Sequence, residues 1–195
     1  DKLKRLGEGP IKIFGYKENK GKGFAIKYGA SKATGNIIGF IDAGGDITPS
    51  SIGVLISFLE KQNADIVIGS KLHPDSRIEY PILRRFLSWG YRNLSRFLFG
   101  FSVKDTQVGL KLFRKKVAGE IFKRTIVRKF AFDIEVLALA HFLGYKKVIE
   151  SPVELSFAGS NSLNSASFWK IIPRMLWDTL AVYYRLKISH AYDKI

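Results

Sequence analysis

The chain has 195 residues, the length of one domain or of one domain with a short appendage, and its 46% hydrophobic content excludes a disordered protein. It contains no cysteine, which excludes disulfides and thiolate metal sites and fits a reducing compartment. Its net charge of +15 favours an anionic partner such as nucleic acid, an acidic membrane surface or a phosphorylated substrate, the alternative being a solvated basic surface.

The first part of the chain alternates between predicted strands and predicted helices. Alternating residues predict a strand over 11–16, helical spacing predicts a helix over 24–33, and a short apolar run predicts a buried strand over 37–41. The same signals predict a helix over 49–61 and a strand over 65–70. This β-α-β-α-β order implies a parallel sheet with helices on both faces.

After residue 70 the pattern changes. A long aromatic and basic segment covers 80–99, a strand with a loop is predicted over 104–113, and a loop rich in Ser, Asn and Gly covers 156–165. Elsewhere the spacing predicts helices over 116–124, 132–143 and 168–186 and a strand over 148–155.

Two carboxylates follow the predicted strand over 37–41. Asp42 and Asp46 are separated by Ala43, Gly44 and Gly45. Ligands of open α/β sheets bind at the carboxyl ends of the strands, and glycines there let the backbone approach a ligand. Two carboxylates can hold a hard divalent cation beside a diphosphate. The alternative is a tight turn with solvated aspartates.

Six segments in this order carry a resemblance to a known family: Asn19–Ala25, Gly35–Ala43, Asp65–Lys71, Asp105–Phe113, Phe132–Leu137 and Gly144–Tyr145. Together they resemble the family 2 inverting glycosyltransferases of the GT-A fold, and most closely the dolichyl-phosphate glucosyltransferases and mannosyltransferases. Each segment alone is a weak signal, whereas the ordered set is specific and covers nearly the whole chain.

The resemblance implies a GT-A, Rossmann-like α/β fold with a mostly parallel sheet and flanking helices. We expect a truncated GT-A domain over 1–160 and a C-terminal amphipathic helical segment over 161–195. The family begins with a β-α-β unit that holds the nucleotide, and the resemblance starts after it. We therefore expect the chain to lack this unit and to bind a nucleotide poorly by itself.

The implied activity is the inverting transfer of a hexose from UDP or GDP to a polyprenyl phosphate such as dolichyl phosphate, at the cytoplasmic face of a membrane. A phosphate acceptor is already anionic, so it needs positioning and charge screening more than deprotonation. Two alternatives stay open. A hydroxyl acceptor on a glycan or protein would need Asp133 as general base, and a non-catalytic membrane-bound GT-A module would need no reaction at all. No nucleic-acid partner is expected, because no binding motif is present.

The resemblance also implies roles for individual residues. Asp42 and Asp46 would hold Mg²⁺ or Mn²⁺, although Gly44 stands where the family usually has a second Asp. Asp105 and Gln107 would shape the sugar and acceptor pocket, the alternative being a polar turn.

Further candidates lie on predicted helices and in loops. Asp133 would face the cleft as a catalytic residue, although acidic residues also stabilise the first turn of a helix through its dipole. The candidates for substrate phosphate binding are Lys22, Lys71, Arg84, Arg85 and Arg92. For the arginines the alternative is the solvated basic face of an amphipathic helix.

Aromatic and basic residues gather in two amphipathic segments, 80–99 and 168–186. Such helices can lie in the interface of an anionic bilayer, and a core helix is the alternative for the second segment. No run of about 18 uncharged apolar residues predicts a membrane-spanning helix. We therefore expect a peripheral association with the membrane, or an anchor outside this chain.

Overall fold

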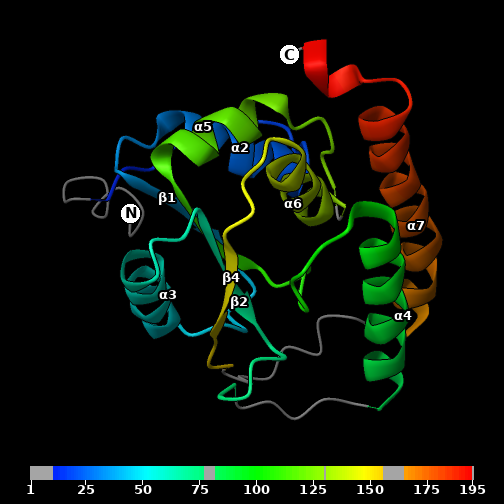
Figure 1. Cartoon of the computed structure of the whole chain (residues 1–195), viewed down its shortest axis with the longest axis horizontal. Coiled ribbons are helices and arrows are strands. Elements are labelled where there is room, and N and C mark those ends of the chain that lie inside the picture. Colours follow the sequence, from blue (N-terminus) through cyan, green and yellow to red (C-terminus); the bar gives the residue numbers. More distant parts are fainter. Residues whose placement is uncertain (1–10, 77–81, 130, 156–164, 195) are drawn as a thin grey trace.

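A mixed sheet forms the centre of the structure (Figure 1). The computed structural model describes residues 11–76, 82–129, 131–155 and 165–194. In these residues four strands pair in the order β1-β3-β2-β4. The strands are β1 (Ile37–Ile41), β2 (Ile66–Ser70), β3 (Leu110–Arg114) and β4 (Val148–Pro152).

Three of these four strands run in the same direction. β2 pairs with β4 in parallel, whereas β3 is antiparallel to both β1 and β2. The expected mostly parallel sheet is therefore confirmed for strand direction, but β1 and β2 are separated by a strand that comes later in the chain. An apolar strand run indicates burial but not strand direction or strand order, so this insertion could not be predicted from the pattern.

Helices account for most of the remaining described chain. Their bounds lie near the predicted ones, and the 23-residue α7 is the longest. They are α2 (Lys22–Lys32), α3 (Ser50–Lys61), α4 (Ile82–Phe99), α5 (Lys115–Arg124), α6 (Phe132–Phe142) and α7 (Ser165–Lys187), followed by a short 3-10 helix, η1 (Ala191–Lys194). The predicted loop over 156–165 lies outside the described residues except for its last position.

The predicted strand over 11–16 was wrong. In the structure these residues form no ladder, and Ile11, Ile13 and Phe14 are exposed. Alternation marks a chain that could be half-buried, but a strand exists only when another strand offers its hydrogen-bonding edge. The following Tyr16 packs instead on α2, with its ring centroid 5.0 Å from that of Phe24.

The sheet separates two hydrophobic clusters, which explains its apolar strands. On one face Ile66, Ile68 and Phe113 pack with residues of α5, α6 and α7. On the other face Val67 and Leu112 pack with residues of α3. Successive side chains of a strand point to opposite faces, so a strand that is covered on both faces must be apolar throughout.

Helices α4 and α7 lie side by side at one end of the molecule (Figure 1). A buried hydrogen bond of 2.8 Å joins Tyr91 Oη on α4 to Thr179 Oγ1 on α7. Thr179 also donates to the Met175 carbonyl one turn earlier. Burial raises the pKa of Tyr91 to about 12, so the Tyr91 hydroxyl keeps its proton at neutral pH. No helix among the described residues is long and apolar enough to cross a membrane.

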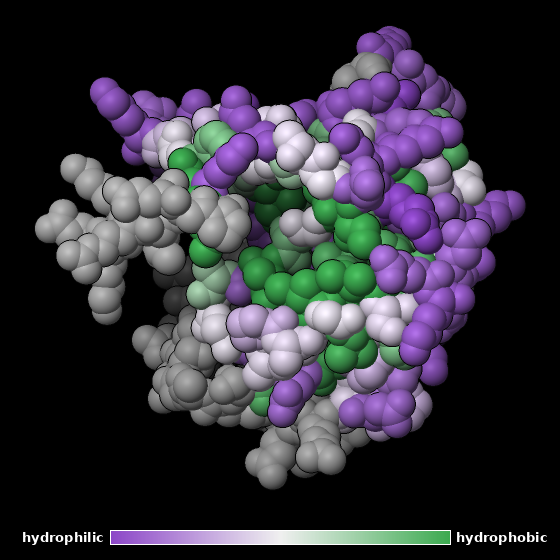
Figure 2. Space-filling model, turned by 90° about the vertical axis from the view of Figure 1, so that its left-hand side faces the viewer, coloured by the Kyte–Doolittle hydropathy of each residue, from purple (hydrophilic) through white to green (hydrophobic). Residues whose placement is uncertain are grey.

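Strand β1 forms one edge of the described sheet. It hydrogen-bonds only to β3, and its residues Gly39 and Ile41 are exposed. The side of the molecule on which β1 and α3 lie shows a hollow lined by hydrophobic residues, with hydrophilic residues above it and to its right (Figure 2). The fold thus places the acidic turn that follows β1 at an accessible edge of the sheet.

Candidate active site

The acidic turn is anchored to the start of β3. The Asp42 amide donates to the Gly109 carbonyl at 2.7 Å. A Cβ atom on Gly109 would lie only 2.1 Å from Asp42 Oδ2, so the carboxylate rests directly on the backbone of that glycine. A larger residue at 109 would displace Asp42, which explains why Gly109 is needed here. The Asp42 side chain keeps 48% exposure.

Asp46 lies over the position that lacks a side chain in this turn. Its Oδ2 would be 3.6 Å from a Cβ atom placed on Gly44, which is ordinary van der Waals contact. Gly45, rather than Gly44, has the positive φ of 75° that favours glycine. The turn therefore has room for a side chain at 44, and the carboxylate of Asp46 already lies beside that position.

Lys22, in the first turn of α2, joins the acidic turn to α6. Its Nζ is 3.0 Å from Asp42 Oδ1 and 2.7 Å from Asp133 Oδ2. These three residues are distant in the chain and come from a helix start, a strand end and another helix start. Their ion pairs bring the predicted metal turn, a predicted phosphate-binding residue and the predicted catalytic Asp133 into one cluster.

Lys111 completes this cluster from below. It is fully buried on β3, on the same face of the strand as Phe113, and its Nζ donates to Asp133 Oδ1 at 2.5 Å and to the Val108 carbonyl at 2.6 Å. Its ammonium lies 5.5 Å from the centre of the Phe40 ring, and that of Lys22 lies 5.6 Å from it. Both oxygens of Asp133 are therefore bound by amines, and an aromatic ring borders both amines.

The two amines of the cluster differ in their acidity. Burial lowers the pKa of Lys111, and the attraction of Asp133 offsets this only in part. Burial also acts to lower the pKa of Lys22, but the carboxylates of Asp133 and Asp42 outweigh it, so the pKa of Lys22 is raised. The surroundings therefore favour the charged form of Lys22 more than that of Lys111.

A basic cavity of about 750 Å³ opens beside Lys22, at the start of α2. Its lining residues include Lys20, Arg128 and Lys129 in addition to Lys22, against a single acidic residue, Glu18. The balance of charge suits an anion with several oxygens, such as a diphosphate. The cavity and the acidic turn share Lys22 as their common residue.

Asp105 and Gln107 organise a neighbouring turn. Asp105 accepts hydrogen bonds from the backbone of Lys71 at 2.9 Å and of Gln107 at 3.3 Å, and its own amide donates to Glu150 Oε1 at 2.9 Å. These contacts are those of the polar-turn alternative, and the role of Asp105 in the sugar and acceptor pocket stays a prediction. The side chain of Gln107 differs, because its Nε2 is buried and has no partner in the described structure. A ligand oxygen could satisfy that donor.

The predicted phosphate-binding residues divide into two groups. Lys22 lies in the cluster, and the backbone of Lys71 contacts Asp105. Arg92 is half-buried on α4, and in the described part of the chain no hydrogen bond or ion pair connects it to the acidic turn. Arg84 and Arg85 belong to the same helix, but their side chains lie outside the described structure.

Sequence reasoning missed Lys111, Phe40 and Gly109. The signal for Lys111 was present, because it is a cation within the apolar strand run Leu110–Arg114. A buried charge is stable only with a partner, so such a residue predicts a buried carboxylate nearby. Nothing in the sequence indicated that the partner would come from α6.

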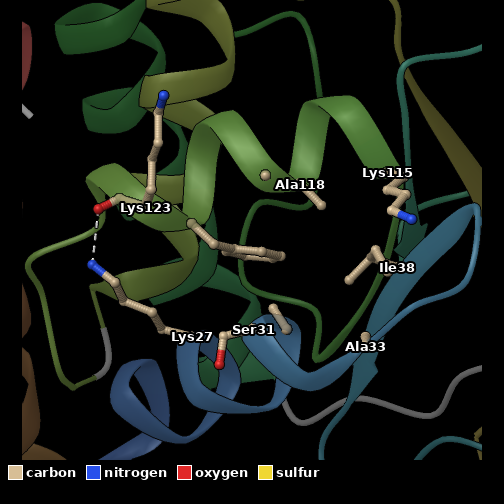
Figure 3. A pocket seen from close by; sticks show the side chains of 10 residues that line it. Lys27, Ser31, Ala33, Ile38, Lys115, Ala118 and Lys123 are labelled. Atoms are coloured by element: carbon tan, nitrogen blue, oxygen red, sulfur yellow. Dashed lines mark hydrogen bonds between the residues drawn. The ribbon is translucent and has the colours of Figure 1, made fainter.

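A second hollow, of about 460 Å³, lies between α2, α5 and β1 and has a different character (Figure 3). Ala33, Ile38 and Ala118 give it an apolar lining. The amine of Lys27 at its rim donates to the Lys123 carbonyl at 2.9 Å, and that of Lys115 donates to the Thr34 carbonyl at 3.1 Å. Because these amines donate to backbone carbonyls, the hollow has fewer charged groups available to bind a ligand than the basic cavity.

Comparison with known proteins gives a family and a set of relatives. The family description "Glycosyl transferase family 2" matches residues 1–122. A dolichyl-phosphate beta-glucosyltransferase of Trichomonas vaginalis is 32% identical over 182 residues, which is 90% of this chain and 55% of the relative. The protein of that name from Saccharomyces cerevisiae is 32% identical over 150 residues, 70% of this chain and 45% of the relative. The chain therefore spans about half the length of the curated relatives it matches.

Solved structures show a similar fold. Glucosyl-3-phosphoglycerate synthase from Mycobacterium tuberculosis, in complex with UDP, matches with a TM-score of 0.62 and 15% identity over 91% of this chain and 58% of that one. The same enzyme with Mn²⁺, UDP-glucose and phosphoglyceric acid gives a TM-score of 0.62 at 14% identity, with 91% and 58% covered. At this identity the likeness shows the fold alone, and that fold is the expected GT-A fold.

Proposed function

The chain belongs to glycosyl transferase family 2, and from this premise we propose that it takes part in the inverting transfer of glucose from UDP-glucose to a polyprenyl phosphate such as dolichyl phosphate. The supporting observation is the cluster at the end of β1, where Asp42, Lys22 and Asp133 meet beside a basic cavity. The names of the relatives favour glucose and a dolichyl-phosphate acceptor, and the ligands of the structural neighbour favour UDP over GDP.

The state of Asp133 favours a phosphate acceptor over a hydroxyl acceptor. A general base must offer a free carboxylate oxygen to the proton that it removes. Asp133 is instead held by the buried amine of Lys111, which stays with it when Lys22 is engaged elsewhere, and only 4% of its side chain is exposed. A phosphate acceptor needs no base, because it is already anionic. We therefore assign Asp133 to electrostatic organisation of the site.

The reaction follows from the charges of the site. An oxygen of the lipid phosphate attacks the anomeric carbon on the face opposite the nucleotide. The bond from that carbon to the diphosphate oxygen breaks, its electron pair leaves with UDP, and the configuration inverts. Negative charge accumulates on the departing diphosphate, and Lys22, Lys20 and Arg128 of the basic cavity would supply positive charge beside it.

A divalent cation fits this turn with two protein carboxylates. Among the described residues, no group of three or more His, Cys, Asp or Glu side chains could hold a metal. Mg²⁺ typically uses one or two carboxylates together with substrate phosphates and water, and Asp42 and Asp46 meet that minimum. We propose that these two residues hold Mg²⁺ or Mn²⁺ against the diphosphate. When bound, the cation would neutralise charge on the leaving group.

The partner surface that we propose is an anionic membrane, and α7 offers the face that would contact it. Trp177, Leu180 and Tyr184 are exposed at 74%, 47% and 54% and follow helical spacing along one side of α7. Its opposite side, with Val182 and Leu186, is buried. Interfacial helices combine such an aromatic face with basic residues. A second copy is a poorer partner, because each chain carries a net charge of +15.

Helix α4 extends this surface. Trp89 and Phe97 are exposed at 60% and 87% on the helix that packs beside α7. Arg84, Arg85 and Arg92 also belong to α4, and we propose that they meet the lipid phosphate at the membrane. Sedimentation with anionic and neutral vesicles tests this surface. We expect salt-sensitive binding to anionic vesicles that Trp177→Ser weakens, and equal failure with both vesicle types would refute it.

The remaining assignments complete the proposal. Gln107 would donate its unpartnered amide to the sugar or the acceptor, from the turn that Asp105 holds in place and in which Lys71 lies. We propose a transferase domain over 1–160 with a membrane-binding segment over 161–195. A cytoplasmic membrane face suits a nucleotide-sugar donor and a chain without cysteine.

The test is a transfer assay with the purified protein, UDP-glucose labelled in the sugar, and vesicles that contain dolichyl phosphate. We expect the label to enter the lipid fraction. GDP-mannose in place of UDP-glucose and vesicles with a free polyprenol in place of the phosphate are the controls. Label on the free polyprenol or on protein would establish a hydroxyl acceptor, and no transfer to any acceptor by a protein that binds UDP-glucose would establish a non-catalytic module.

A further inference from the structure

Lys22, Lys111 and Asp133 form two ion pairs, and these residues differ in how much each depends on its partner. Asp133 has a side chain that is 4% exposed, so it needs a counter-ion at all times. It has two, Lys111 at 0% exposure and Lys22 at 26%. If the amine of Lys22 moved away, Lys111 would still neutralise Asp133.

Lys22 can also leave its second partner, Asp42. The Asp42 side chain is 48% exposed, so water can solvate its carboxylate when the ammonium departs. Surface ion pairs of this kind contribute little to stability, because water competes for both charges. Lys22 is therefore bound by two groups, neither of which depends on it.

Lys22 also borders a space into which its amine could move. It lines the basic cavity with Lys20, Arg128 and Lys129. The backbone holds this wall in place, since the Gly23 amide donates to the Arg128 carbonyl at 3.0 Å. A Cβ atom on Gly21 would lie 2.2 Å from the same carbonyl oxygen, which shows how closely the loop and the start of α2 approach.

From this geometry we infer that Lys22 is an exchangeable cation, which pairs with Asp42 and Asp133 in the free protein and moves to the phosphate oxygens of an anionic ligand in the basic cavity. Lys111 is the fixed counter-ion that lets this exchange happen. Asp42 competes with the ligand for Lys22. The identification of the ligand as a nucleotide diphosphate rests on the proposed function, whereas the exchange itself requires only a phosphate anion.

The test is calorimetric titration of the purified protein with inorganic pyrophosphate in the presence of a chelator. Lys22→Met should weaken binding by about tenfold or more, because it removes a charge-assisted contact. Asp42→Asn should tighten binding by roughly two- to fivefold, the range expected from releasing one half-exposed ion pair. Lys61→Met, an exposed change at the end of α3, is the matched control and should leave binding unchanged.

The double variant separates competition from simple repulsion. Removing the charge of Asp42 reduces its repulsion of pyrophosphate whether or not Lys22 is present. Competition predicts that the gain from Asp42→Asn is larger in the parent than in the Lys22→Met background. Equal gains in the two backgrounds, or a parent that does not bind pyrophosphate, would overturn the inference.

The fixed role of Lys111 has its own test. Lys111→Met should weaken pyrophosphate binding several-fold although Lys111 does not line the cavity, because Lys22 must then stay with Asp133. Adding Asp133→Asn should restore binding, since no buried carboxylate then holds Lys22. A purely structural role of Lys111 instead predicts that binding falls and recovers only as far as the folded fraction does, which unfolding curves of both variants measure. If Lys111→Met alone does not fold, the double variant, which removes both buried charges, must still bind at least as tightly as the parent.

These outcomes are independent of the transfer assay, because pyrophosphate binding requires neither sugar nor lipid. If the protein transfers glucose but Asp42→Asn gives equal gains in pyrophosphate affinity in the two backgrounds, only this inference is wrong. If the expected exchange occurs without transfer, only the proposed reaction is wrong.

Discussion

Asp133 and Glu135 lie two residues apart at the start of α6, and both are buried. Their side chains contact different regions of the molecule. Asp133 is bound by the amines of Lys22 and Lys111. Glu135 accepts hydrogen bonds from the backbone of Val127 and from the hydroxyl of Tyr192. The carboxylate of Asp133 is bound by cations, whereas that of Glu135 is bound by neutral donors, with a weaker attraction from Arg185, and its contact with Tyr192 holds the C-terminal end against α6.

The contacts of a buried carboxylate therefore distinguish a residue of the candidate site from a structural residue on the same helix. Neutral donors stabilise a buried carboxylate without adding a second buried charge. Glu135 therefore has a structural role. Cationic partners couple Asp133 to the charge of any ligand that approaches Lys22. Substitutions at the two positions should therefore differ in size, in rescue and in their effect on activity.

The largest effect on stability is expected for Asp133→Asn. This change leaves the buried amine of Lys111 without its carboxylate, which should lower the free energy of unfolding by about 3–5 kcal/mol. Lys111→Met combined with Asp133→Asn should recover much of this loss, because both charges are then gone. Denaturant unfolding of the single and double variants measures both values. A double variant no more stable than Asp133→Asn would show that the buried pair does not act as a unit.

The next largest effect concerns Asp42, the exposed carboxylate of the cluster. Asp42→Asn should reduce glucose transfer in the presence of Mg²⁺ on the order of 100-fold, the usual cost of removing one group that stabilises a developing charge. Its stability should change by less than about 0.5 kcal/mol, because Asp42 is half-exposed. Steady-state kinetics and unfolding in parallel measure the two. Parent-like turnover would mean that the cationic side chains carry the diphosphate without this turn.

Glu135→Gln should cost about 1–2 kcal/mol in the free energy of unfolding, less than Asp133→Asn. The glutamine carbonyl can still accept from the backbone amides and from Tyr192, so no charge is left unpaired. The folded variant should transfer glucose at the parent rate. A loss as large as that of Asp133→Asn would contradict the distinction between the two carboxylates.

A smaller effect should appear in the pH dependence of stability. Burial raises the pKa of Glu135, and its hydrogen bonds offset this only in part. The native state therefore holds the Glu135 proton more tightly than the unfolded chain. Stability from this group is full below the unfolded pKa of about 4.3 and is lost as pH rises through the raised native pKa. The cost of Glu135→Gln, measured by unfolding across this range, should thus shrink as pH rises, and a constant or growing cost would refute the assignment.

The smallest effect is expected for Gly44→Asp. The nearest atom to a Cβ there is 3.6 Å away and Gly44 has no positive φ, so stability should change by less than about 0.5 kcal/mol. The added carboxylate supplies the ligand that the family usually has at this position. Activity titrated with Mg²⁺ should therefore saturate at a lower metal concentration than in the parent. Gly44→Asn, which adds similar volume without charge, is the control and should not shift the titration.

Much of the fold could be read from the sequence because burial leaves periodic patterns. The predicted helices over 49–61 and 116–124 and the strands over 37–41 and 65–70 are found close to their expected places. The segment over 11–16 shows the limit of the method, since its alternation is real and its pairing is absent. Pairing depends on a partner strand, and no local pattern contains that information.

The candidate site was predicted only in part for a related reason. Asp42 and Asp133 were chosen from motifs, and the structure brings both to Lys22. The contacts of Asp105, in contrast, are those of a turn. The part played by Lys111 could not be predicted, because a lysine in a strand becomes a counter-ion only when a carboxylate from another element is buried against it.

The acidic turn after β1, the basic charge and the positions of most helices could be predicted from the sequence, and the resemblance to family 2 glycosyltransferases predicted the GT-A class. These features are local or depend on the order of residues along the chain. The tertiary structure alone decided that β3 enters between β1 and β2, and that Lys22, Asp133 and Lys111 form one cluster. The reason is physical: ion pairs and strand pairing join residues that are close in space, and their energies depend on burial, which exists only once the chain has folded.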